Sequence, residues 1–328
     1  MVLGIESSCD ETGIAIVRNG VEVIANEVAS QIDIHREFGG VVPEIASRQH
    51  TTIISQLTEK VLAEAGIRIK DIDGIAATQG PGLMGALLVG LCFGKALAYA
   101  WKKPFVPVHH IEGHLFSVFL GEARPEFPLL ALVVSGGHTQ LIHWEAPHQY
   151  TILGATRDDA VGESFDKVAR LLNLPYPGGP SIQRAAEGGN PEAFDFPRAM
   201  MGRNTLDFSY SGLKTAVLYA LQAGDLCVAD VAASFQHAAV DALVRKTQQA
   251  LDQTGLSRLA LAGGVAANRL LRDRLMAECN ATVYLPPFKY CIDNGAMIAA
   301  AACSRLDLGL TGDLSTVANP NLPFTSLA

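Results

Sequence analysis

The sequence has little charge, few aromatic residues and no apolar run long enough to cross a membrane. Charged residues make up 18% of the 328 residues and aromatic residues 7%, whereas apolar residues reach 49%. An average protein has about 25% charged residues. A disordered chain is excluded, because disorder requires high charge and low hydrophobicity. The longest apolar run, residues 85–99, contains Lys95 and falls short of the roughly 20 residues of a membrane span, so we expect no membrane partner.

Paired cysteines, a signal sequence and an excess of basic residues are also absent. The six cysteines are scattered and include no CxxC pair, a pattern typical of free thiols in a reducing compartment. The first residues, MVLGIESSCDET, carry Glu6 and Asp10 where a signal peptide has basic residues and then an apolar stretch. We therefore expect a cytoplasmic protein. The net charge of −8 argues, taken alone, against a nucleic-acid partner.

The sequence contains one order of predicted elements twice. Residues 2–30 predict a strand, a turn and two further strands joined at Asn19-Gly20, and residues 128–146 begin the same way. Residues 72–90 predict a strand, a glycine turn and a helix, and residues 256–278 repeat that pattern. This alternation predicts an α/β fold, in which strands buried on both faces explain the apolar excess. We interpret it as a duplicated fold, with two unrelated α/β domains as the alternative.

We expect the chain to divide near residue 127. An N-terminal domain would span residues 1–127, to which the C-terminal helix can cross over, and a C-terminal domain would span residues 128–328. Residues 185–212 lack periodicity and predict a surface excursion. Helices are predicted near residues 44–65 and 85–101, and their apolar faces belong either to the core or to a subunit interface.

A glycine pattern before the second of these helices has two interpretations. Gly80, Gly82 and Gly85 form G-x-G-x-x-G between a strand and a helix. No acidic residue ends a second strand about 20 residues further on, as a dinucleotide site requires. Close packing of the helix on the strand is therefore the better interpretation.

Two other glycine turns predict contact with a phosphate. Residues 134–139 (V-S-G-G-H-T) and 262–268 (A-G-G-V-A-A-N) can present backbone N–H groups to an anion. Residues 6–12 (E-S-S-C-D-E-T) offer hydroxyls and carboxylates in the equivalent turn of the first half. Such turns, repeated in two halves, are typical of the actin, Hsp70 and sugar-kinase superfamily, in which a nucleotide lies between two duplicated domains.

A pair of histidines suggests a metal site. His110 and His114 are spaced i and i+4, so on a helix their imidazoles share one face. The zinc-protease motif H-E-x-x-H is absent, because Ile111 follows His110 and Glu112 is out of register. Asp293 is a candidate third ligand, although a carboxylate before a helix can also be a simple N-cap. Two histidines and one carboxylate would leave coordination positions open, as in iron and catalytic zinc sites.

Taken together, the motifs resemble one family over residues 2–305. They are ESSCDETGIAI, FGGVVPEIASRQH, GPGLMGALLVG, PVHHIEGH, LVVSGGHTQLI, GESFDKVARLL, YPGGP, FSYSGLKTA, AGGVAANRLLR and DNGAMIA. The chain is identified by this resemblance as a member of the TsaD family of tRNA N6-adenosine threonylcarbamoyltransferases. Its older name was the O-sialoglycoprotein endopeptidase family.

The resemblance implies a duplicated actin-like or Hsp70-like α/β fold with a nucleotide cleft between two domains. It implies transfer of the threonylcarbamoyl group from threonylcarbamoyl-AMP to N6 of adenosine 37 in tRNAs that read codons beginning with A. It also implies that His110, His114 and Asp293 bind one divalent transition metal, Fe²⁺ or Zn²⁺, with Mg²⁺ as an option beside the nucleotide. The residues implied to bind the adenylate are Val133, Val134, Ser135, Gly136, Gly137, Asp166, Gly179 and Asn268.

One departure assigns the chain to the bacterial branch. Archaeal and eukaryotic members carry a tyrosine that can join the metal where this sequence has Val133, so three protein ligands are expected. Bacterial members act with an inactive paralogue of the same fold and a small ATPase, and another enzyme makes the adenylate. The net charge of −8 then predicts weak tRNA binding by the isolated chain.

The catalytic groups and the overall activity have alternatives. We expect Asp10 and Glu11 to give polar catalytic support, although acidic residues in a turn can serve solvation alone. Lys214 in S-G-L-K-T is either a substrate contact or a solvated lysine. The competing activities are a metalloprotease, as the older family name says, and a non-catalytic nucleotide-binding scaffold.

Overall fold

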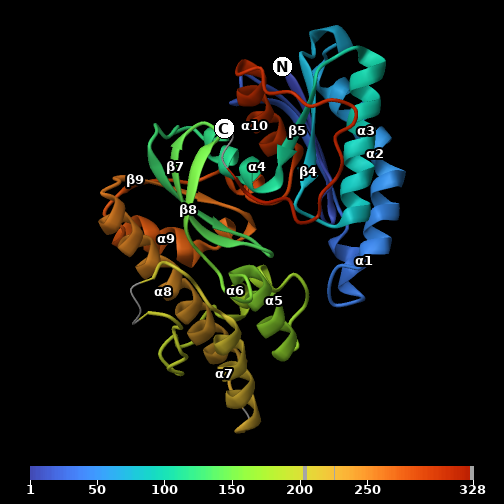
Figure 1. Cartoon of the computed structure of the whole chain (residues 1–328). Helices are drawn as coiled ribbons and strands as arrows, with labels where there is room; N and C mark the ends of the chain where they lie inside the picture. The colour runs from blue at the N-terminus through green and yellow to red at the C-terminus, as the bar shows by residue number, and fades with distance from the viewer. Residues whose placement is uncertain (202–204, 225, 326–328) are drawn as a thin grey trace. The chain divides into compact units, whose positions relative to one another are not determined.

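The computed structural model (Figure 1) describes residues 1–201, 205–224 and 226–325. Contacts divide the chain into two compact units, of which unit 1 comprises residues 1–124 and 286–325. Unit 2 comprises residues 125–285. The last helix and the segment after it therefore belong to unit 1, although they come last in the sequence.

Unit 1 is built on a five-stranded mixed sheet. Its strands are β1 (Val2–Glu6), β2 (Glu11–Arg18), β3 (Glu22–Ser30), β4 (Gly74–Gly80) and β5 (Phe105–His109). Their order is β3-β2-β1-β4-β5, with β1 to β3 antiparallel and with β4 and β5 parallel to β1. The predicted turn between β2 and β3 is confirmed, because Asn19 and Gly20 both adopt positive φ, 52° and 72°.

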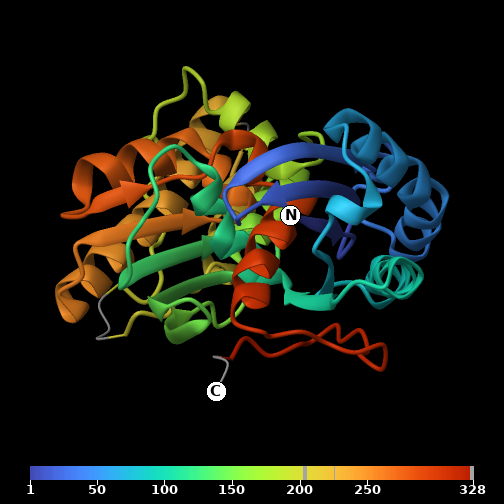
Figure 2. The same cartoon turned by 90° about the horizontal axis from the view of Figure 1, so that it is seen from above.

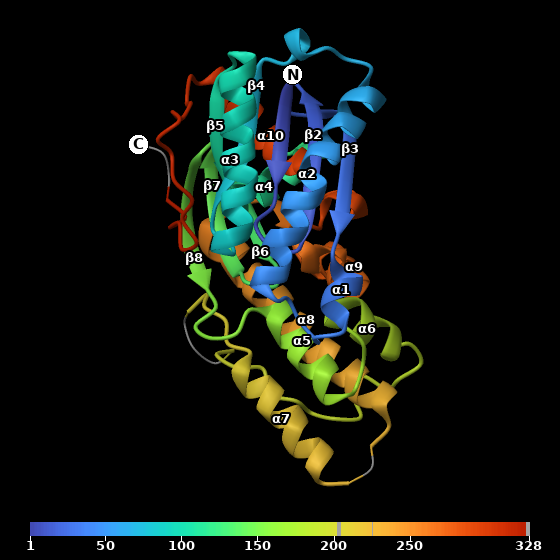
Figure 3. The same cartoon turned by 90° about the vertical axis from the view of Figure 1, so that its right-hand side faces the viewer.

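Helices cover both faces of this sheet. They are α1 (Ile32–Arg36), α2 (Pro43–Ala65), α3 (Met84–Trp101), α4 (His110–Phe116) and α10 (Gly295–Asp307), with 3₁₀ turns η1 (Ile69–Asp71), η2 (Ser117–Leu120) and η4 (Phe288–Tyr290). Figure 3 shows α2 and α3 in front of one face, and α10 packs with α4 on the other. Every residue of β1 is consequently buried, as expected for a strand that is covered on both sides.

Glycines allow α10 to lie directly against the sheet. A Cβ atom at Gly4 in β1 would lie 2.4 Å from the Gly295 carbonyl oxygen, and one at Gly13 in β2 would lie 2.6 Å from the Gly295 nitrogen. No larger side chain fits at such distances. A Cβ atom at Gly13 would also lie 2.8 Å from the Cα atom of Asn294, so the segment before α10 passes beside the turn between β1 and β2.

Residues 312–324 form a C-terminal strap that runs past α3 and β5 (Figure 2). Its carbonyl oxygens at Leu314 and Thr316 accept hydrogen bonds from Lys95 Nζ at 3.2 and 2.9 Å. Lys95, the one charge within the apolar run, thus holds the strap. A Cβ atom at Gly80 would lie only 1.9 Å from the Asn319 carbonyl oxygen, so this glycine allows close approach of the strap. Close packing was expected between the helix and the strand, but the first glycine of the pattern meets the strap instead.

The apolar helix α3 is buried along one side in unit 1. In the described part of the chain, α3 is the one helix that is long and apolar enough to cross a membrane, and its mean hydropathy is 1.5. It packs against β4 and α2, as the core helix of a folded domain does. Met84, Leu88 and Tyr99 on its outer side are 46%, 45% and 75% exposed.

Unit 2 repeats the topology of unit 1. Its strands are β6 (Leu129–Val134), β7 (Thr139–Ala146), β8 (Gln149–Ala155), β9 (Arg258–Ala262) and β10 (Thr282–Tyr284). They lie in the order β10-β9-β6-β7-β8, with β6 to β8 antiparallel and with β9 and β10 parallel to β6. This is the order of unit 1 when β6 is matched to β1 and β9 to β4. The expectation of a duplicated α/β fold is therefore confirmed.

The helices of unit 2 flank this second sheet. They are α5 (Val161–Leu171), α6 (Gly178–Ala185), α7 (Ser211–Gln222), α8 (Val228–Thr254) and α9 (Arg269–Glu278), with the 3₁₀ turn η3 (Gly264–Ala267). α8 packs on β6, α9 packs on β10 and α8, and α5 packs on α6 (Figure 1).

The excursion predicted for residues 185–212 runs along α8 without regular structure in most of its described part. Polar side chains of α8 hold its backbone: Asp230 accepts a hydrogen bond from Asn190 N at 2.8 Å, and the buried Lys246 donates to Met200 O at 3.0 Å. Residues 202–204 of the predicted excursion lie outside the described residues.

Candidate active site

His110, His114 and Asp293 meet in unit 1 at the end of β5. His110 begins α4 and His114 lies one turn further on, so both imidazoles leave the same side of the helix. Their Nε2 atoms lie 3.6 and 3.2 Å from Asp293 Oδ1. One ligand atom from each residue lies within 4.8 Å of the other two. The three side chains could therefore share one metal ion.

The chemistry of this group fits a transition metal. Both ring nitrogens of His114 are buried and neither forms a hydrogen bond within the described part of the chain, although Nε2 lies near Asp293. Buried ring nitrogens normally have a partner, and a shared metal ion would supply one. Two imidazoles and a carboxylate are the donors of iron and catalytic zinc sites and leave positions open.

The structure also distinguishes the two interpretations of Asp293. Helix α10 begins at Gly295, and its N-cap is Asn294, whose side-chain oxygen accepts a hydrogen bond from Met297 N at 3.0 Å. The capping role thus belongs to the neighbouring residue, and the Asp293 carboxylate lies beside the two histidines.

Glu6, expected only as one of the carboxylates in the turn of residues 6–12, lies beside His110. Its Oε2 atom is 3.2 Å from His110 Nδ1. Burial alone would raise the pKa of Glu6, but the charge and hydrogen bond of His110 outweigh burial and lower it. For His110, burial lowers the pKa, and the charges of Asp293 and Glu6 outweigh it and raise the pKa to about 9. An acidic residue at the end of an otherwise apolar strand was the available sequence signal.

Asp10 and Glu11 lie in unit 1, beside the turn between β1 and β2. They are only 6% and 9% exposed, which disagrees with a role in solvation alone. Burial is the main reason why the pKa of Glu11 lies well above its usual range, and the neighbouring charges of Asp10 and Asp293 add to it. Ser30 Oγ donates a hydrogen bond to Glu11 Oε1 at 3.1 Å.

His50 of α2 holds the backbone of this turn. Its Nε2 atom lies 2.9 Å from the Cys9 carbonyl oxygen, and its Nδ1 atom lies 2.7 Å from Thr12 Oγ1. Burial is the largest cause of its lowered pKa, which favours the neutral ring that can donate at one nitrogen and accept at the other. His50 is the last residue of the motif FGGVVPEIASRQH, and no local pattern around it indicates this role.

The predicted phosphate turn of unit 2 connects β6 and β7. Val133 and Val134 belong to β6 and have fully buried side chains, so a ligand could meet only their backbone. Ser135 N donates to His138 O at 2.8 Å, which closes the turn. Gly136 and Gly137 are exposed, and a Cβ atom on either would meet nothing within 4 Å.

The other predicted adenylate residues lie on α5, α6 and the start of α9. Asp166 Oδ1 accepts a hydrogen bond from Gly178 N at 2.7 Å, so Asp166 and the adjacent Gly179 come together. Asn268 has a structural use: its Oδ1 accepts from Leu271 N at 3.0 Å as the N-cap of α9. Lys214 is half-buried in the first turn of α7.

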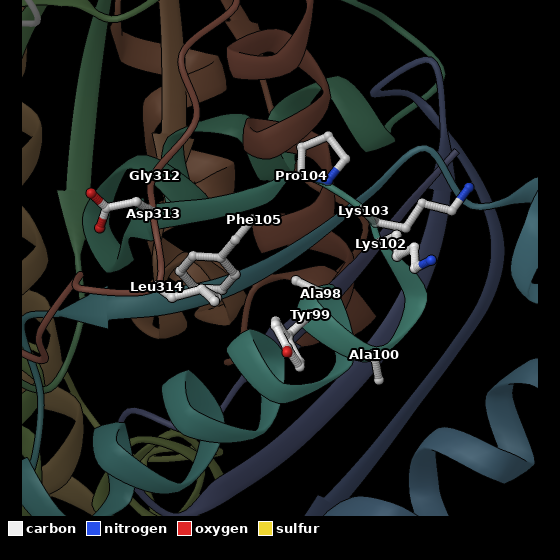
Figure 4. Close-up of a pocket in the computed structure, with 10 residues that line it drawn as sticks. All are labelled: Ala98, Tyr99, Ala100, Lys102, Lys103, Pro104, Phe105, Gly312, Asp313 and Leu314. Atoms are coloured by element: carbon white, nitrogen blue, oxygen red, sulfur yellow. The ribbon is translucent and has the colours of Figure 1, made fainter.

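A hollow of about 590 Å³ lies beside the first residue of β5, and Figure 4 shows the side chains that line it. It is lined by Ala98, Tyr99, Ala100, Lys102, Lys103, Pro104, Phe105, Gly312, Asp313 and Leu314. Phe105 begins β5 whereas His110 follows its last residue. The hollow is therefore separate from the group of candidate ligands.

Several solved structures match almost the whole of this chain in fold. The activator of 2-hydroxyisocaproyl-CoA dehydratase from Clostridium difficile, with bound ADPNP, matches with a TM-score of 0.54 and 14% identity over 96% of this chain and 99% of that chain. Component A of (R)-2-hydroxyglutaryl-CoA dehydratase from Acidaminococcus fermentans matches with a TM-score of 0.54 and 15% identity over 94% and 98%. HypF from T. kodakarensis matches with a TM-score of 0.63 and 16% identity over 93% of this chain and 47% of HypF. At such identities the likeness shows the fold alone, which is the actin-like α/β fold.

The family assignment comes from the sequence. A model of the family described as TsaD, tRNA N6-adenosine threonylcarbamoyltransferase, matches residues 22–300. This match covers the elements from β3 into α10 and includes all three candidate metal ligands. The chain therefore belongs to the TsaD family of tRNA-modifying transferases.

Proposed function

We propose that this chain transfers the threonylcarbamoyl group of threonylcarbamoyl-AMP to N6 of adenosine 37 in tRNAs that read codons beginning with A. The observation that carries the proposal is the convergence of His110, His114 and Asp293 in a chain of the TsaD family. The family supports a tRNA-modifying transferase, and the donor, the acceptor atom and the tRNA position are the finer part of the proposal.

In this proposal, His110, His114 and Asp293 hold one Fe²⁺ or Zn²⁺ ion through two imidazole nitrogens and a carboxylate oxygen. When bound, such an ion supplies Lewis-acid polarisation of the acyl group and neutralises phosphate charge. The position of Asp293 beside both imidazoles supports this assignment, because its negative charge favours a cation at that point.

The residues of unit 2 would bind the adenylate part of the donor, with Mg²⁺ as an option beside its phosphate. The exposed backbone at Gly136 and Gly137, next to the buried Ser135, would approach the phosphate, since a Cβ atom at either glycine would meet nothing within 4 Å. Asp166 would accept hydrogen bonds from ribose hydroxyls next to Gly179, and Asn268 would contribute from the start of α9. Val133 and Val134 would contribute only through the backbone at the end of β6.

Asp10 and Glu11 would manage the proton of the accepting amine. The N6 amine is a weak nucleophile, so attack on the acyl carbon requires positioning and removal of a proton. The raised pKa of Glu11 makes its carboxylate a stronger base than an ordinary glutamate. Both side chains belong to the turn that His50 holds in place through the Cys9 carbonyl oxygen.

We propose that the chain acts in the cytoplasm with a paralogue of the same fold and a small ATPase. Three exposed apolar side chains on the outer side of α3, Met84, Leu88 and Tyr99, support a partner subunit, because methionine and aromatic residues are enriched at interfaces. The net charge of −8 means that partner proteins would supply part of the contact to tRNA phosphates.

Mass spectrometry of tRNA nucleosides tests this proposal. The purified chain, its two partners, threonylcarbamoyl-AMP and a tRNA with adenosine at position 37 should yield threonylcarbamoyladenosine. A tRNA with guanosine at that position is the matched control and should stay unmodified. No modified adenosine with all components present would reject the proposal, and metal-dependent cleavage of a sialoglycoprotein by the same preparation would replace it with a protease.

A further inference from the structure

Glu6 is a fully buried carboxylate at the end of β1. Burial of a charged group is costly unless it is paired and hydrogen-bonded. The matching strand of unit 2, β6, ends on Val134, which is equally buried. The fold thus accepts an apolar residue at this position. The presence of a buried carboxylate in unit 1 is therefore explained by something other than the stability of the fold.

The partners of Glu6 come from three different elements. Its Oε1 atom accepts a hydrogen bond from Ser8 N at 2.5 Å, and its Oε2 atom accepts one from Thr78 Oγ1 in β4 at 2.6 Å. Oε2 also lies 3.2 Å from His110 Nδ1 at the start of α4. Within the described ranges no lysine or arginine forms an ion pair with Glu6, and His110 Nδ1 is the ring nitrogen that lies beside its carboxylate.

The two ring nitrogens of His110 face in different directions. Nδ1 is turned toward Glu6 and Ser8, whereas Nε2 lies 3.6 Å from Asp293 Oδ1. Metal-binding histidines commonly donate the N–H of their second nitrogen to a carboxylate, which fixes the ring and its tautomer.

We propose that Glu6 is a positioning residue of the metal site: its carboxylate accepts the Nδ1–H of His110 and thereby directs Nε2 of that ring toward Asp293 and His114. This inference rests on the proposed metal site and does not depend on the reaction or its substrates. Glu6 also accepts Ser8 N from the turn that carries Asp10 and Glu11, so the same side chain links that turn to the metal-binding helix.

Glu112 provides a matched control on the same helix. It is as fully buried as Glu6, but its carboxylate accepts hydrogen bonds from Arg305 of α10 at 2.6 and 2.8 Å. Replacing either carboxylate by an amide removes one buried charge, but the partner of Glu6 is the candidate ligand His110, whereas the carboxylate of Glu112 is bound to Arg305.

Zinc affinity of the full chain, measured by competition with a chelating dye, tests the inference. Glu6→Gln should bind Zn²⁺ roughly 10–100-fold more weakly than the parent chain, while Glu112→Gln should keep the parental affinity. Parental affinity in Glu6→Gln, or an equal loss in Glu112→Gln, would overturn the positioning role and leave the proposed metal site intact. Absence of zinc and iron binding by the parent chain would instead reject the proposed metal site, and this inference with it.

A second measurement uses the unmodified chain and is independent of how well the variants fold. Nitrogen-15 NMR of the zinc-loaded parent should show His110 with a proton on Nδ1 and zinc on Nε2. Zinc on Nδ1 would overturn the proposal, because that nitrogen could then not donate to Glu6. Ser8 Oγ is the second neighbour of His110 Nδ1. Ser8→Ala should therefore weaken zinc binding, but less than Glu6→Gln does. A larger loss in Ser8→Ala than in Glu6→Gln would also overturn the proposal.

Discussion

The two units use one topology and differ at the turn between their first two strands. In unit 1 the first strand ends on Glu6, which pairs with Gly13, and in unit 2 it ends on Val134, which pairs with Thr139. Both end residues are fully buried. The same position in the backbone therefore carries a charge in one unit and an apolar side chain in the other.

The residues of the two turns continue this difference. The turn of unit 1 reads S-S-C-D over residues 7–10 and leads into Glu11, whereas the turn of unit 2 reads S-G-G-H over residues 135–138. Carboxylates favour a cation, while small residues with exposed backbone favour a phosphate. We infer that the two copies of one scaffold were specialised differently: unit 1 by the acidic side chains of its turn, and unit 2 by the glycines of its turn.

The largest expected effect is on the metal chemistry of unit 1. His114→Ala removes one of three candidate ligands, so the chain should lose its metal, and tRNA modification should fall about a thousandfold, because a Lewis acid contributes several kcal/mol. Metal content and initial rates measure the effect. Binding of an adenylate analogue, followed by calorimetry, should persist if unit 2 binds it independently. A variant that keeps its full metal content would show that the ligands are assigned wrongly.

The next effect tests the acidic turn. Glu11→Gln should lower kcat/KM about a hundredfold while metal binding stays intact, since a positioned base contributes roughly 10²–10⁴-fold. Because the pKa of Glu11 is raised, its carboxylate form should become populated only above the usual glutamate range. The parent rate should therefore rise with pH there, and the variant should lack this rise. Glu22 is an exposed carboxylate paired with Arg18. Its variant Glu22→Gln is the control and should behave like the parent.

The glycine turn of unit 2 should give a smaller effect. Gly136→Val should leave the fold intact, because a Cβ atom at this position would meet nothing within 4 Å. It should weaken adenylate binding roughly tenfold, a loss of about 1.4 kcal/mol, by blocking close approach of the phosphate. Zinc binding by unit 1 should not change. Gly212→Val, also in open space within unit 2, is the matched control, and an equal loss in that variant would count against a local effect.

The smallest effect concerns the C-terminal strap of unit 1. Lys95→Met removes two hydrogen bonds to the carbonyl oxygens of Leu314 and Thr316 and should lower the free energy of unfolding by about 1 kcal/mol. Hydrogen exchange should become faster in residues 312–319. Lys102→Met is the control, because Lys102 makes no contact with these carbonyl oxygens among the described residues. Unchanged exchange in Lys95→Met would show that the strap is held by other contacts.

Local patterns predicted most of the helices and strands, and they placed the two histidines of the candidate metal site together. The i, i+4 spacing places His110 and His114 on one face of a helix, and Asn19-Gly20 predicts the turn that the structure contains. The sequence allowed two roles for Asp293, metal ligand and N-cap, because an acidic residue before a helix is a common cap. Its neighbour Asn294 performs the capping, which is visible only once hydrogen bonds are known.

Contacts between distant residues could not be predicted in this way. Glu6 and His110 are 104 positions apart, and they meet because β1 pairs with β4 and β4 pairs with β5. Lys95 interrupts an apolar run for a reason located more than 200 positions later, where the strap passes. The sequence around Glu6 gives no indication of His110, and the sequence around Lys95 gives no indication of the strap.

The sequence by itself determined the alternation of strands and helices, their duplication, the family and the histidine pair, because each depends on residues close together in the chain or on a family motif. The tertiary structure decided which carboxylates are buried beside those histidines and why glycines stand at the contact between α10 and the sheet. The physical reason is that periodicity and turn chemistry act over a few residues. Burial and charge pairing depend on strand order and helix packing, which bring together segments from opposite ends of the chain.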